Sequence, residues 1–230
     1  MDARVAIQVP AGDPDALYKD RENRDSAIKA AEIWAARLAA NSKDFESAYR
    51  LAQARYWLGT NGLPAPERRA ALEAGIVAAR AAVAMDSTRP EGHFWMAANM
   101  GALAESFGLT QGIKYRGQIK SALLAALKAN PAYLDGSADR ALGRWYFKVP
   151  GLFGGSNRKS EEHLRKALSY NTDSIITRLF LAETLEDLGR VPEARKEAQA
   201  AVDAPFDPDW TPEDRRFKEE AKRMLQRLSR

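Results

Sequence analysis

The chain has 230 residues, enough to bury a sizeable core, and its composition of 45% hydrophobic and 29% charged residues is ordinary for a folded globular protein. Its 35 Lys and Arg and 31 Asp and Glu give a net charge of +4, and the two signs alternate along the chain, which argues against a nucleic-acid surface. The absence of cysteine excludes disulfides, thiolate nucleophiles, and zinc–thiolate or iron–sulfur sites.

The N-terminal stretch MDARVAIQVPAGDPDALY has neither a basic segment nor an apolar core of the kind found in export signals. A chain trimmed of its leader would look the same, so this start does not decide the compartment. We expect residues 1–23 to form an N-terminal extension, followed by a single repeat domain over residues 24–230.

Long Ala-rich segments, in which apolar residues recur three and four positions apart, predict that the rest of the chain is helical. The Asn or Asp near each helix end, Asn41, Asp86, Asn130 and Asn171, recurs at spacings of 45, 44 and 41 residues, which indicates stacked helical hairpins. A first helix is expected near 24–40 and a capping helix near 212–228. The second helices of the hairpins are expected near 67–85, 113–129, 158–170 and 191–203.

The last hairpin, RLFLAETLEDLGRVPEARKEAQAAVDAP, indicates the repeat type. Leu181, Ala182 and Leu185 precede Gly189, and a series of alanines follows it, as in a tetratricopeptide repeat. Small residues at these positions let paired helices approach closely. The predicted fold class is therefore all-α, a tetratricopeptide-like helical-hairpin superhelix (α-α solenoid) with about four hairpins and flanking helices.

The turns inside the earlier hairpins, TNGLPAP, GLTQG and PGLFGGSN, are longer than the last one, GRVP, and would lie along one edge that could serve in binding or assembly. Gly154, Gly155 and Ser156 belong to this edge. Two interpretations are open for their turn. It could cradle an anion at a helix N-terminus, or it could simply reverse the chain, and the lack of a phosphate-loop motif favours simple reversal.

No catalytic set and no metal site emerge from the sequence. The two histidines, His93 and His163, are 70 residues apart and lack ligand spacing, and no nucleophile motif is present. We therefore expect no enzymatic activity and no cofactor, and a hydrolase built on the Gly-Gly-Ser turn is disfavoured.

The first helices of the hairpins carry aromatic and charged side chains that would line the inner face of a superhelix. Such a mixture suits a groove for peptide, protein or an amphipathic small molecule, whereas packing between helices is the simpler alternative for each aromatic residue. Glu183 and Glu186 are expected on the same face. The candidate ligand or partner residues are Trp95, Arg140, Arg144, Phe147, Tyr49 and Tyr56.

A specific series of motifs spans residues 90–228: a Trp-bearing helix in PEGHFWMAANMGALAESFGL, R-x-L-G-R and P-x-x-x-G-G in RALGRWYFKVPGLFGG, and the tail DPDWTPED. In these motifs the chain resembles the T-component family of tripartite ATP-independent periplasmic (TRAP) transporters. Residues 1–89 match only as similar helical hairpins. The segment ALGRWYF is also similar to the repeat domain of the eukaryotic regulators of microtubule dynamics. In those proteins the double-glycine turn is not a fixed feature, so this resemblance ranks second.

The first resemblance implies a periplasmic, often lipid-anchored homotrimer that binds a hydrophobic small molecule and partners the substrate-binding protein of a TRAP transporter. The cysteine that would carry the lipid is absent. The sequence therefore predicts a non-enzymatic binding protein that accompanies a transporter. The alternative is a tetratricopeptide-repeat scaffold that binds a peptide or protein, and a cytoplasmic location stays open.

Overall fold

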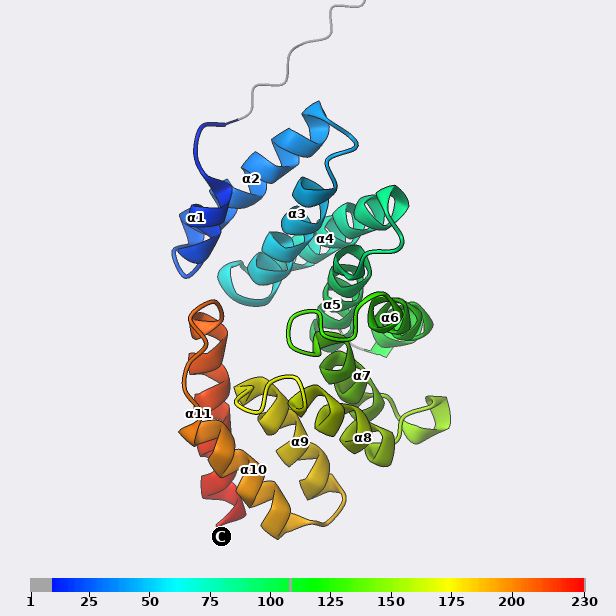
Figure 1. Ribbon diagram of the computed structural model, residues 1–230, viewed down its shortest axis with the longest axis vertical. Helices are drawn as coiled ribbons and strands as arrows, with labels where there is room; N and C mark the ends of the chain where they lie inside the picture. The colour runs from blue at the N-terminus through cyan, green and yellow to red at the C-terminus, as the bar shows by residue number, and fades with distance from the viewer. Residues whose placement is uncertain (1–9, 108, 230) are drawn as a thin grey trace, which may run out of the picture. The chain divides into compact units, whose positions relative to one another are not determined.

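The computed structural model describes residues 10–107 and 109–229, in which every regular element is helical (Figure 1). The all-α tetratricopeptide-like fold is confirmed. The helices are α1 (Pro14–Lys19), α2 (Arg24–Ala40), α3 (Phe45–Trp57), α4 (Ala65–Met85), α5 (Pro90–Ser106), α6 (Leu109–Ala129), α7 (Ser137–Lys148), α8 (Asn157–Leu168), α9 (Ile175–Asp187), α10 (Val191–Asp203) and α11 (Thr211–Leu228), with a π-helical turn at Leu58–Gly62 and a 3-10 turn at Gly151–Phe153.

Local sequence signals set the helix boundaries. The side chains of Asn23, Asp44 and Ser174 accept hydrogen bonds from backbone N–H groups in the first turns of α2, α3 and α9. Pro90 stands in the first turn of α5, where its missing N–H costs nothing. Gly189, with φ +75°, lets the chain leave α9 in a left-handed conformation.

The expected hairpins are present: α3 packs on α4, α5 on α6, α7 on α8 and α9 on α10. The predicted flanking helices near 24–40 and 212–228 correspond to α2 and α11. Alanines such as Ala79, Ala126 and Ala198 are fully buried between helices, and their small side chains permit close approach.

The chain divides into two compact units, residues 1–129 and 130–230. In the first unit, α1 packs on α2, where the rings of Tyr18 and Trp34 meet edge to face at 5.9 Å, and the Trp57 indole donates to the Arg21 carbonyl at 2.8 Å. Pro14, Tyr18 and Arg21, which belong to the expected extension, are thus buried in the first unit. Residues 1–9 of the extension lie outside the described part, and the single-domain boundary at residue 24 stays a prediction.

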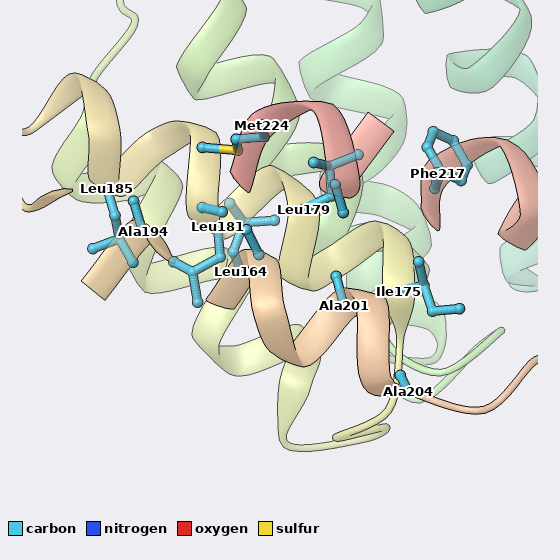
Figure 2. Packing of buried hydrophobic residues seen from close by; sticks show 13 residues of the cluster. Leu164, Ile175, Leu179, Leu181, Leu185, Ala194, Ala201, Ala204, Phe217 and Met224 are labelled. Carbon is cyan, nitrogen blue, oxygen red and sulfur yellow. The ribbon is translucent and has the colours of Figure 1, made fainter. Parts of the chain in front are cut away.

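The second unit has its own hydrophobic core, in which side chains from α8, α9, α10 and α11 converge (Figure 2). Leu164, Leu181 and Leu185 are fully buried, and Phe217 and Met224 attach α11 to the cluster. Burying a side chain of this size contributes about 1.5–3 kcal/mol. The capping helix is thereby held in place, and it begins at Thr211, one residue after the N-cap Trp210.

Across the described residues, each helix is too short or too polar to cross a membrane.

Candidate binding face

The second unit presents a row of cations on α7. Arg140, Arg144 and Lys148 are spaced four residues apart, so they follow one side of the helix. The acid of this helix, Asp139, is fully buried: it accepts from His163 Nδ1 at 2.7 Å and has Lys166 Nζ 3.3 Å from its other oxygen. With its carboxylate occupied by α8, α7 presents these three cations on its outer side.

Arg144 connects α7 to α9, which lies beside it in the second unit. Its guanidinium forms an ion pair with Glu183 and lies 4.3 Å from the centroid of the Phe180 ring. The Phe147 ring, 5.7 Å from the guanidinium, is on its own helix. Side-chain exposures of 21% for Arg144 and 31% for Glu183 leave both groups within reach of solvent. We name Arg140, Arg144, Phe147, Lys148, Phe180 and Glu183 the α7–α9 face.

Two further carboxylates, Glu186 on α9 and Asp214 on α11, interact with groups of the second unit. Arg227 binds the Glu186 carboxylate with both terminal guanidinium nitrogens. Burial raises the pKa of Asp214, although the hydrogen bond from the Asp207 N–H and the positive charge of Arg140 act in the opposite direction. The charge of Arg140 thus acts on the Asp214 carboxylate of α11, and Arg144 pairs with the Glu183 carboxylate of α9.

The structure brings three of the predicted site residues, Arg140, Arg144 and Phe147, onto this face, together with the expected Glu183. The other three lie in the first unit. Trp95 is 2% exposed and contacts the ring of Tyr56 at 5.7 Å, and Tyr49 is 8% exposed. Trp95 and Tyr49 therefore pack between helices, and a ligand could touch little of either residue.

Tyr49 illustrates this packing. Its hydroxyl donates to Glu46 at 2.8 Å, and burial, together with this hydrogen bond, raises its pKa to about 12. The phenol is therefore neutral and held in the helix surface over the whole physiological pH range.

The Gly-Gly-Ser turn is closed by its own backbone. Gly154 N–H donates to Gly151 O, Gly155 N–H to Pro150 O, and Ser156 N–H to Tyr146 O at 2.9 Å. The Ser156 hydroxyl caps α8 by accepting from Lys159 N–H. These donors are used internally, so chain reversal is favoured over the anion cradle; a role for the turn in assembly stays a prediction.

An open hollow of about 450 Å³ lies at the hairpin edge beside α8 and the α9–α10 turn. Arg190 reaches Glu161 at 2.7 Å and also pairs with Glu193. Burial raises the pKa of Glu161, but hydrogen bonds from Arg165 and Arg190 outweigh it and hold that pKa below its usual value. The hollow is thus bordered by carboxylates and cations that satisfy one another.

Histidines and carboxylates of the described residues form no group that could hold a metal ion. Sequence reasoning missed Phe180 and Lys148. Both had a signal, because Phe180 lies three residues before Glu183 and Lys148 four after Arg144, each on the same helix face as its predicted neighbour.

The chain has no match among curated proteins. Among solved structures it is similar to TTC0263, a thermophilic tetratricopeptide-repeat protein of Thermus thermophilus, with 22% identity, a TM-score of 0.68, and coverage of 93% of this chain and 97% of the other. It is also similar to MamA, with 17% identity, a TM-score of 0.56, and coverage of 92% and 99%. At these identities the likeness establishes the fold.

A family model described as regulator of microtubule dynamics protein 1-3 matches residues 13–153. This match overturns the resemblance to TRAP T-components, on which the expected transporter partner, trimer and periplasmic location had rested. The motifs that suggested that family are packing and turn features: a Cβ at Gly143 would lie 2.6 Å from Leu164 Cγ, and one at Gly155 would lie 1.6 Å from Val149 O. Any closely packed hairpin can require such glycines. Because this family model matches more than half of the chain, the protein belongs to the regulator of microtubule dynamics protein 1-3 family.

Proposed function

We propose that the protein is a non-enzymatic scaffold whose α7–α9 face binds an acidic, aromatic-containing segment of a partner protein. The observation that carries the proposal is Arg144, a partly exposed guanidinium that lies near the Phe147 and Phe180 rings and pairs with Glu183. Arginine's planar fork suits carboxylates, and flanking rings supply apolar contact area.

The charge of α7 favours an acidic partner over a basic one. Arg140, Arg144 and Lys148 share one side of the helix, while its own acid is buried against α8. A carboxylate of the partner could replace Glu183 on Arg144 and gain contact with the neighbouring cations. Glu183 would then act as a placeholder that keeps Arg144 oriented in the free protein.

A matched pair of substitutions tests this exchange. Arg144→Gln and Glu183→Gln break the same ion pair and therefore share any structural cost, yet they should change binding in opposite directions. The probe is a fluorescent Glu-rich peptide with one central Phe, followed by anisotropy, with a peptide in which Lys replaces each Glu as its counterpart. We expect Arg144→Gln to weaken binding of the acidic peptide by about tenfold, the value of one charge-assisted hydrogen bond, and Glu183→Gln to strengthen it.

Arg195→Gln, an exposed change on α10, is the control for loss of one positive charge. Equal effects of Arg144→Gln and Glu183→Gln, or tighter binding of the Lys-containing peptide, would overturn the proposal. Since the family description concerns microtubule dynamics, polymerised tubulin is the first whole partner to test, by co-sedimentation with the same variants.

A further inference from the structure

The turn between α7 and α8 carries an unusually exposed apolar tip. Leu152 is 91% exposed and Phe153 44% exposed, and both stand in the 3-10 turn Gly151–Phe153. Large apolar side chains at this level of exposure, adjacent in sequence on a projecting turn, indicate a surface for interaction.

The sequence on both sides of this tip is basic. From Arg140 to Ser160 the chain contains five basic residues and no acidic one, and Lys148, Arg158 and Lys159 are the three nearest the turn in sequence. Glu161 and Glu162 follow, and Arg158 lines the hollow beside α8 together with them. Lys159 Nζ lies 5.6 Å from the centroid of the Tyr146 ring, which places this cation over the last turns of α7, beside the base of the tip. Leu152 and Phe153 with cations on either side complement a surface whose interior is apolar and whose outer layer is anionic.

Four backbone donors from Phe153 to Ser156 are paired within the protein. The N–H groups of Phe153, Gly154, Gly155 and Ser156 donate to carbonyls at 2.8, 3.0, 3.2 and 2.9 Å. Backbone donors without a partner are costly to bring among lipid acyl chains, and these four have partners within the turn and α7.

We propose that the turn of residues 149–155 docks on an anionic phospholipid membrane, with Leu152 and Phe153 entering the headgroup and acyl boundary and Lys148, Arg158 and Lys159 contacting lipid phosphates and carboxylates. Binding is reversible and peripheral, since one small apolar tip supplies little buried area and its cations act only within a Debye length of the surface. The tip shares Lys148 with the α7–α9 face, whereas Leu152, Arg158 and Lys159 lie outside that face, so substitutions at these three residues test membrane binding separately from partner binding.

Because the sequence contains no cysteine, a single introduced cysteine can be labelled at one defined position. Leu152→Cys in the full chain takes an environment-sensitive thiol dye at one position. Val77→Cys, at a residue that is 67% exposed on α4, provides the matched control. Phosphatidylcholine vesicles with phosphatidylserine should shift the emission of the dye at 152 to the blue and leave the dye at 77 unchanged, and vesicles without phosphatidylserine should shift neither.

Unlabelled variants test the two components of the surface by vesicle co-sedimentation. Leu152→Ser should reduce the bound fraction on phosphatidylserine vesicles severalfold, and Arg158→Gln with Lys159→Gln should do the same and weaken the dependence of binding on added salt. An unchanged bound fraction in both variants would overturn the proposal. A blue shift at 152 that grows with protein concentration in the absence of vesicles would also overturn it, because a second copy would then cover the tip.

Discussion

Single residues in this protein show how burial changes the role of a side chain. Tyr49 and Trp95 are aromatic residues of a kind that often binds ligands, but they are only 8% and 2% exposed and therefore pack inside the first unit. Arg144 and Phe147 were predicted as site residues for the same reason, and both are partly exposed on α7. Residue type was thus a weaker guide than the side of the helix on which each residue lies.

The raised pKa of Tyr49 predicts a pH dependence. The folded protein holds the phenolic proton more tightly than the unfolded chain, so the stabilisation from this group is complete below pH 10 and is lost as the pH rises toward about 12. Absorbance titration of tyrosinate should show a late-titrating component that Tyr49→Phe removes. A titration curve that is unchanged at its alkaline end in Tyr49→Phe would contradict this assignment.

At the level of elements, glycine decides how closely α7 and α8 can turn back on each other. A Cβ at Gly155 would lie 1.6 Å from Val149 O, whereas a Cβ at Gly151, in the same turn, meets nothing within 4 Å. The turn therefore tolerates side chains at its tip but not at its base.

Gly155→Ala should lower the free energy of unfolding by about 2–4 kcal/mol because backbone must move to admit the methyl group, while Gly151→Ala should change it by less than about 0.5 kcal/mol. Urea unfolding followed by circular dichroism measures both. Comparable stability of the two variants would show that the base of the turn is more adaptable than its geometry indicates.

For the whole molecule, the division into two compact units predicts that a destabilising substitution lowers the stability of the unit that contains it and leaves the other unit unchanged. Asn99, fully buried on α5, donates to Ala52 O on α3 at 3.0 Å and to Trp95 O at 2.8 Å, and so links two first helices of the first unit. The second unit is held by the separate cluster around Leu164 and Leu181.

Asn99→Ala should therefore cost roughly 1–3 kcal/mol in the first unit by leaving a buried carbonyl without its donor. Native-state hydrogen exchange should speed up in α3–α5 and stay unchanged in α9–α11, and Gly155→Ala should give the converse pattern. Exchange that accelerates uniformly along the chain in either variant would show that the two units unfold as one.

The sequence by itself determined the helices from α2 onward, their hairpin pairing and the repeat type, because the 3.6-residue period, the recurrent Asn or Asp near each helix end and the small residues between helices are local signals; it missed α1, which lies in the expected extension. It also placed Arg140, Arg144, Phe147 and Glu183 on one face. Its motif resemblance to transporter components was wrong, because glycines that close a hairpin recur wherever helices pack tightly.

Tertiary structure alone decided which aromatic residues are buried, that Asp139 is occupied by His163 and Lys166, and that Leu152 and Phe153 project from the turn. Each of these facts depends on neighbours far along the chain. Asp139 and His163 are 24 residues apart, and Arg144 and Glu183 are 39 residues apart. Local periodicity specifies the face of a helix, but only the packing of other helices decides whether that face is covered.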